Sequence, residues 1–206
     1  MSLSQNLKYL AVGAATGLLA CSGAAIAQSG NQSWQLVGVN ARLDQTINSD
    51  SVKQGQAIEA RLDGTVTTSD GMKLEKGTEL MGTVADAASS AHGGPASLTL
   101  LFTKAQMKDG KQIPVKVTLL AAYPSSQADS GEYGDSLVAP APRHVDPQQK
   151  VVQQAGMLRH VEMKSSVQGQ NSGTFWKSDG NFRLAKGTYL QVGIAATSDS
   201  GPSTGE

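Results

Sequence analysis

The chain has 206 residues, and its 17 Lys and Arg residues balance its 17 Asp and Glu residues. Aromatic residues make up only 4%, and no cluster of cations stands out to neutralise phosphates, so the composition argues against a nucleic-acid-binding protein. The 23 glycines and the frequent Ser, Thr and Gln residues favour a turn-rich β fold with a polar surface.

Residues 1–27 are predicted to be a signal peptide. Lys8 is the only charged residue of this segment, and the uncharged run that follows is rich in Leu and Ala. The run ends in A-I-A (25–27), which places small side chains at the two positions that a signal peptidase reads. We expect cleavage between Ala27 and Gln28 and a periplasmic or extracellular location. The alternative is an uncleaved membrane anchor, for which the run is long enough but interrupted by glycines.

A second interpretation of the leader involves Cys21, the only cysteine of the chain. The residues L-L-A-C (18–21) resemble a lipobox, in which the cysteine is acylated and becomes the new N-terminus. Acylation of Cys21 would make the protein a membrane-anchored lipoprotein, and only then do we expect a membrane partner. Cleavage after Ala27 instead leaves a mature chain without cysteine, which excludes a disulfide framework.

The rest of the chain is predicted to form one all-β, mainly antiparallel domain, either a single β-barrel or a β-sandwich. Its apolar and polar residues alternate with the period of two that strands require. We expect residues 28–39 to be a lead-in and first strand, 40–195 to be the β domain, and 196–206 to be a disordered tail. Strands or strand pairs are predicted at 34–47, 56–67, 78–85, 97–107, 112–123 and 188–195.

Glycine-containing turns separate several of these strands. Asp70-Gly71 and Asp109-Gly110 are strong hairpin signals. Pro114 lacks a donor for the strand ladder, which indicates an edge position or a strand end. The alternation after the second turn predicts one buried face, made of Ile113, Val115, Val117 and Leu119.

Residues 124–170 are predicted to be an insertion made of a long loop and one short helix. Pro, Ser, Gly and Asp dominate its first part. The helix is expected at 147–158, with Asp146 as its cap and Pro147 at the first helical position, where a missing N–H is tolerated. Its apolar side is expected to consist of Val151, Ala155 and Leu158.

A short pattern, L-x-K-G-T-x-L, occurs twice, at 74–80 and 184–190. Each copy predicts a turn with a positive φ at glycine, followed by a strand. The repeat is open to two interpretations, a recurring hairpin solution and an internal duplication. Both predict two similar corners of one barrel or sandwich.

Five segments of the chain together suggest a family resemblance: D-G-T-V (63–66), L-E-K-G-T-E-L-M-G-T-V (74–84), K-D-G-K (108–111), I-P-V-K-V (113–117) and K-G-T-Y-L-Q-V-G-I (186–194). Their order resembles the C-terminal β-barrel domain of the TrbI-like family, the scaffold proteins of conjugation and type IV secretion core complexes. The resemblance covers residues 40–195 and implies a β-barrel and a role in a secretion assembly. Family members insert a helical projection late in the barrel, about where residues 124–170 lie. The chain departs from the family in having no cytoplasmic region and no long Pro-rich stretch, so we expect a stand-alone exported domain.

The sequence contains no recognisable catalytic or metal-binding motif, and we expect neither a metal nor a cofactor. It has no G-x-S-x-G motif and no phosphate-binding glycine loop. The three histidines, His92, His144 and His160, lack the spacing of a metal site. A glycosidase needs two facing carboxylates, for which the candidates are Glu59, Asp63 and Asp86.

The leading prediction is an exported, non-catalytic β domain that acts as a structural or interaction module in the periplasm or cell envelope. An envelope protein would bind through the loops at 87–96 and 124–146, or by strand addition at an exposed edge. One alternative is a subunit of a secretion or outer-membrane assembly, as the resemblance implies. The other is a hydrolase assembled from distant loops, with His160 or convergent carboxylates in a pocket.

Overall fold

The computed structural model describes residues 34–90, 94–125, 141–142, 144–158 and 160–197, and within 153–157 the backbone alone. By its contacts the chain divides into two units, Met1–Gln32 and Ser33–Glu206, and every described residue belongs to the second. The predicted signal peptide therefore lies outside the described residues, together with Cys21, Ala27 and Gln28. The same holds for residues 198–206 of the predicted tail.

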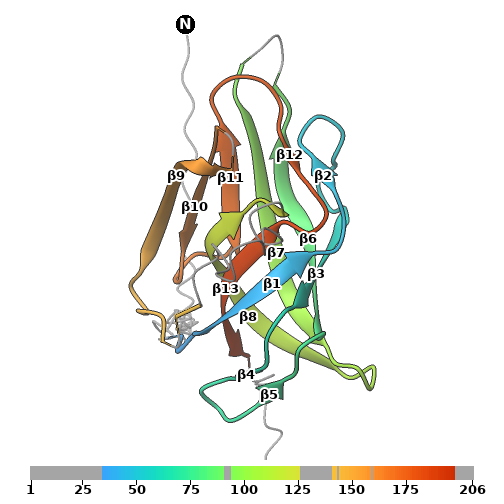
Figure 1. Ribbon diagram of the computed structural model, residues 1–206, viewed down its shortest axis with the longest axis vertical. Coiled ribbons are helices and arrows are strands. Elements are labelled where there is room, and N and C mark those ends of the chain that lie inside the picture. The colour runs from blue at the N-terminus through green and yellow to red at the C-terminus, as the bar shows by residue number, and fades with distance from the viewer. Residues whose placement is uncertain (1–33, 91–93, 126–140, 143, 159, 198–206) are drawn as a thin grey trace, which may run out of the picture. The chain divides into compact units, whose positions relative to one another are not determined.

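The elements of the described chain are thirteen β-strands, β1 to β13 (Figure 1). In chain order they are β1 (Val37–Leu43), β2 (Ile47–Asn48), β3 (Ala57–Leu62), β4 (Val66–Thr67), β5 (Lys73–Leu74), β6 (Glu79–Ala88), β7 (Ala96–Gln106), β8 (Gln112–Tyr123), β9 (Lys150–Leu158), β10 (Val161–Ser166), β11 (Gly173–Lys177), β12 (Arg183–Leu184) and β13 (Tyr189–Ala196).

Six of these strands close into an antiparallel β-barrel. They neighbour one another in the order β6-β3-β1-β13-β8-β7, and β7 pairs with β6 again to complete the circuit. Three more strands, β11, β10 and β9, continue the sheet outward from β7, and we call them the extension (Figure 1). The prediction of an all-β, antiparallel fold is confirmed, and the architecture is the barrel.

The barrel interior is filled by the apolar residues whose alternation predicted the strands. Along β3, buried and exposed residues alternate without exception, and β8 buries its four predicted residues. A fully buried Leu or Ile side chain stabilises the fold by about 2 kcal/mol. The second half of β8 is buried on both faces, because a separate apolar cluster covers it from outside. That cluster consists of Leu36, Leu120, Val145, Val167 and Ala195.

The predicted helix at 147–158 is wrong, because this segment forms a turn and then strand β9. Asp146 does cap a turn, since its carboxylate accepts the N–H of Gln148 at 2.8 Å, and its carbonyl accepts the N–H of Gln149 at 2.9 Å. The chain then runs extended, with Val151 packed inward and Val152 facing outward. The β-branched pair favours this conformation, and pairing with β10 supplies its backbone hydrogen bonds. Among the described residues, none lies in a helix long and apolar enough to cross a membrane.

The two copies of L-x-K-G-T-x-L form equivalent corners of the barrel. Gly77, with φ of 90°, donates its N–H to the carbonyl of Leu62 at 2.8 Å. Gly187, with φ of 83°, donates its N–H to the carbonyl of Leu43 at 2.7 Å. The threonine carbonyls that follow accept the N–H groups of the same two leucines, both at 2.9 Å. The prediction of two similar corners is confirmed.

A second repeat, which the sequence analysis did not identify, lies next to the first. The pattern A-R-L-D-x-T occurs at 41–46 and at 60–65. The hydroxyl of Thr46 accepts the N–H of Lys186 at 3.1 Å, and that of Thr65 accepts the N–H of Lys76 at 3.2 Å. The threonine of each copy of the second repeat thus accepts a hydrogen bond from the turn of one copy of the first.

The two repeats are related by an approximate two-fold axis that exchanges β1 with β3, β13 with β6, and β8 with β7. The axis passes between β1 and β3, where Arg42 lies opposite Arg61. Even the β-bulges correspond, since the β6–β7 register shifts after Met81 and the β13–β8 register shifts after Gln191, the matching position of the repeat. A hairpin turn that merely recurs would not require the neighbouring strands and β-bulges to correspond as well.

The extension joins the barrel at Ser172, where β8 leaves β7. The N–H of Ser172 binds the carbonyl of Leu100 at 2.9 Å, and its carbonyl accepts the N–H of Leu119 at 2.8 Å. Its hydroxyl accepts the N–H of Phe102 at 2.9 Å. One fully buried serine therefore bridges both strands at the point where they separate.

Candidate functional site

The outer face of the extension carries the two large apolar side chains that are most exposed among the described residues. Val152 of β9 is 62% exposed, and Trp176 of β11 is 36% exposed. Lys164 of β10 lies between them, since it is the cross-strand partner of Val152 and its ammonium lies 5.7 Å from the centre of the Trp176 ring. The three side chains thus lie on neighbouring strands of one face and combine apolar and cationic character.

The alternation of strand side chains explains why this surface forms. Met163 and Phe175 are paired across β10 and β11 and are buried against the barrel. Their neighbours along each strand must point the opposite way, which directs Lys164 and Trp176 outward. The surface is therefore a direct consequence of packing the inner face of the extension.

Strand β9 forms the outer edge of this sheet. Its residues 150–153 and 158 pair with β10, and in the part of the chain that the structure describes no other strand pairs with β9 (Figure 1). An edge strand presents unpaired N–H and C=O groups that a further extended segment can bind.

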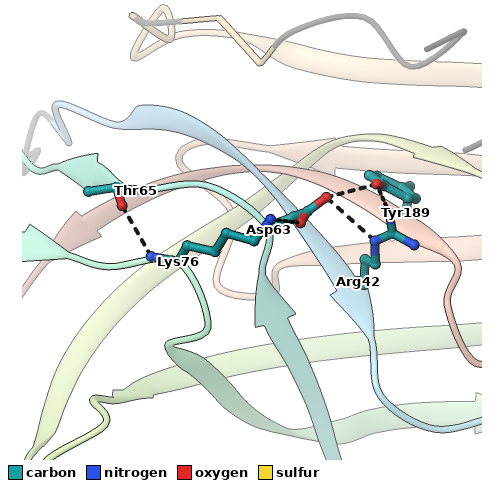
Figure 2. Close-up of polar contacts among 5 residues, drawn as sticks. All are labelled: Arg42, Asp63, Thr65, Lys76 and Tyr189. Carbon is teal, nitrogen blue, oxygen red and sulfur yellow. Dashed lines mark hydrogen bonds and ion pairs between the residues drawn. The ribbon is translucent and has the colours of Figure 1, made fainter. Parts of the chain in front are cut away.

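Apart from this surface, a polar cluster surrounds Asp63, which directly follows β3 (Figure 2). Its carboxylate accepts a hydrogen bond from the Tyr189 hydroxyl at 2.7 Å and forms ion pairs with Lys76 at 3.0 Å and Arg42 at 3.5 Å. Arg42 also donates to the Tyr189 hydroxyl, and its guanidinium lies 4.2 Å from the centre of the tyrosine ring. The backbone N–H of Lys76 is held by the Thr65 hydroxyl (Figure 2).

The surroundings of Asp63 shift two pKa values in opposite directions. Partial burial works against ionisation of Asp63, but hydrogen bonds from Tyr189 and Lys76 and the charges of Lys76 and Arg42 outweigh it, so the pKa of Asp63 is lowered. Burial, reinforced by the hydrogen bond to Asp63, raises the pKa of Tyr189. At neutral pH the pair is therefore an ionised carboxylate with a neutral phenol beside it.

The two-fold axis places a related but different cluster around Arg61. Arg61 is the counterpart of Arg42, and it pairs with Asp44 at 3.1 Å and with Glu79 at 2.8 Å. Glu79 occupies the position that Tyr189 holds in the other half. Each half thus ties its arginine to the aspartate of the other, which indicates that both clusters fasten β1 to β3.

A cavity of about 340 Å³ lies between the β9–β10 turn and the corner at 184–190. Its walls include Leu158, Val161 and Phe182, and its described lining contains no His, Asp or Glu side chain. In the described chain no three His, Cys, Asp or Glu side chains are grouped to hold a metal ion.

The residues proposed for catalysis do not come together. Glu59 and Asp86 are exposed on β3 and β6, whereas Asp63 is engaged in the cluster described above. His144 and His160 are exposed, and His160 takes a positive φ of 58° in the β9–β10 turn. His92, which falls at 91–93, and residues 126–140 and 143 of the predicted loop lie outside the described residues.

No functional role was predicted from the sequence for Arg42, Tyr189, Trp176 or Val152. The A-R-L-D-x-T repeat was a signal for the arginine, because two copies of an identical charged corner imply a shared structural role. Val152 was placed within a helix, so its exposure on a strand edge was not foreseen. No protein family model matches the chain, and a comparison with curated proteins finds no match.

Proposed function

We propose that the protein is an exported, non-catalytic interaction module of the periplasm or cell envelope, which binds an extended segment of an envelope protein at β9. The observation that carries the proposal is the combination of an edge strand with an exposed apolar residue, Val152, the third of its nine residues. Backbone hydrogen bonds supply affinity in strand addition, and side-chain contacts supply specificity.

The charges around β9 define the chemistry of the partner segment. Lys150 and Lys164 are exposed on or beside the edge strand, while Glu162 is half-buried. A segment with an apolar residue to cover Val152 and acidic residues near the two lysines complements this surface. Trp176, whose ring lies beside the Lys164 ammonium, offers the partner segment a further apolar contact on the outer face of the extension.

Site-specific photo-crosslinking tests the strand-addition proposal. A photoreactive residue at position 152 should yield one adduct of defined mass in intact cells, whereas the same residue at exposed Thr83 on β6 should not. The double variant Lys150→Glu, Lys164→Glu should abolish the adduct, because it reverses the charge that attracts the partner. Equal adducts at both positions, or an adduct that survives charge reversal, would contradict the proposal.

Export itself is tested on the mature N-terminus. We expect intact-mass spectrometry of the protein purified from its native envelope to show a chain that begins at Gln28. A chain that begins at Cys21 and carries added acyl mass would show instead that the protein is a lipoprotein. A chain that retains residues 1–20 would contradict export by cleavage.

A second candidate function is a subunit of a TrbI-like secretion assembly. The six-stranded barrel and the insertion late in it favour this candidate, although the insertion contributes β9 and β10 where the family has a helical projection. Mild detergent extraction followed by size-exclusion chromatography distinguishes the two. An assembly subunit should elute in a large complex, whereas the stand-alone module should elute near its monomer mass.

A further inference from the structure

The cavity of about 340 Å³ is built by the meeting of the extension with one corner of the barrel. Leu158 and Val161, which flank the β9–β10 turn, form one wall, and Phe182 and Ala185 form another. The first three of these side chains are almost fully buried, so they form a fixed apolar lining.

Two cations, Lys177 and Arg183, also line the cavity. Their described partners are neutral, because the Lys177 ammonium binds the carbonyl of Asn181 at 3.2 Å and the Arg183 guanidinium binds the Thr46 hydroxyl at 3.4 Å. Within the described chain neither cation forms an ion pair. The cavity therefore combines an apolar wall with uncompensated positive charge.

The two-fold axis supplies an internal comparison. The equivalent place at the other corner is a groove in which Glu75 and Thr78 are the counterparts of Ala185 and Thr188, and whose other lining residues are Met107, Lys108 and Asp109. Among the described residues, none of the extension lines this groove, which carries two acidic residues and one lysine, whereas the described lining of the cavity has two cations and no acidic residue. A net positive charge beside an apolar wall is thus specific to the corner that the extension covers.

We propose that this cavity binds a small amphipathic anion, namely a single apolar chain that ends in a carboxylate. The chain lies against Leu158, Val161 and Phe182, and the carboxylate accepts hydrogen bonds from Lys177 and Arg183. The volume lies near the lower limit of ligand pockets, roughly 300 Å³, which suits one short chain and not a two-chain lipid. This proposal does not depend on strand addition at β9, although Leu158 at the end of that strand lines the cavity.

Calorimetric titration of the purified full chain with octanoate tests the proposal. We expect saturable binding at one site, and binding of octylamine, which has the same chain length and the opposite charge, at least about tenfold weaker. Absence of saturable octanoate binding would overturn the proposal, and so would equal affinity for octylamine.

Matched variants at the two corners locate the site. Arg183→Gln should weaken octanoate binding about tenfold, as expected for the loss of one charge-assisted hydrogen bond. Lys73→Gln changes the counterpart of Arg183 at the other corner and should leave the affinity unchanged. Thermal melts of both variants check that the fold is intact. An affinity that is insensitive to Arg183→Gln, or equally sensitive to Lys73→Gln, would refute the assignment.

Discussion

At the scale of single residues, Asp63 joins side chains from three separate parts of the barrel. Its carboxylate, which is only 25% exposed, contacts a buried tyrosine hydroxyl and two cations from three different strands or turns. Hydrogen bonds to a charged group contribute more than those between neutral groups. Asp63 therefore links the end of β3 to β1, to β13 and to the turn that contains Lys76.

We expect Asp63→Asn to lower the free energy of unfolding by about 1–3 kcal/mol at pH 7, because it removes the anion that Lys76, Arg42 and Tyr189 share. Chemical denaturation measures the change. Asp44→Asn, at the two-fold-related position, is the matched control and should cost less than about 1 kcal/mol, since its ion-pair partner Arg61 is half-exposed. Equal costs at the two positions would contradict this account.

The lowered pKa of Asp63 also predicts a pH dependence. A carboxyl group whose folded pKa lies below its unfolded value of about 3.9 stabilises the fold above that value, and the contribution is lost as the pH falls through the folded pKa. The difference in stability between the wild type and Asp63→Asn should be constant near neutrality and shrink below about pH 4. A difference that grows on acidification would show that the pKa is raised.

At the scale of elements, the segment at 147–158 shows how weakly local sequence separates a helix from a strand. Apolar residues at 151, 155 and 158 match a helical spacing, and Asp146 with Pro147 matches a helix start. The same Asp146 serves equally well as the cap of a turn before a strand. Pairing with β10, which is fixed by the tertiary structure, decides the outcome.

The junction at Ser172 is the element-scale feature that holds the extension on the barrel. We expect Ser172→Ala to cost about 1–3 kcal/mol of unfolding free energy, because it leaves the buried N–H of Phe102 without its acceptor. Ser178→Ala, at an exposed position nearby, is the control and should change stability by less than about 0.5 kcal/mol. Hydrogen exchange should quicken at Phe102 in the first variant alone, and unchanged exchange there would exclude the proposed role.

At the scale of the whole domain, the approximate two-fold axis predicts that matching residues can be exchanged between its halves. Gly64 is the counterpart of Gln45, it has no positive φ, and an added Cβ would lie 3.6 Å from Val39. We expect Gly64→Gln to change the free energy of unfolding by less than about 1 kcal/mol. Gly77→Ala should cost about 1–2 kcal/mol, because φ of 90° strains any residue with a Cβ. A larger cost for Gly64→Gln than for Gly77→Ala would disprove the equivalence.

Much of the fold was predictable from the sequence because strand alternation and turn chemistry are local. The hairpin glycines at 71 and 110 have the positive φ that their turns require, and the predicted buried residues of β8 are buried. The repeat at 74–80 and 184–190 predicted two similar corners, which the backbone hydrogen bonds confirm. The candidate sites were less predictable, since Val152, Lys164 and Trp176 come from three strands that no sequence pattern joins.

Except at 147–158, the sequence by itself determined that the described chain is built of antiparallel strands, because side-chain periodicity and glycine turns act over a few residues. Only the tertiary structure decided that β6 and β7 close the barrel, that Ser172 bridges β7 and β8, and that the extension leaves β9 at an edge. Each of these features depends on pairing between residues far apart in the chain. Such pairing is selected by the packing of the whole core, which a local pattern does not encode.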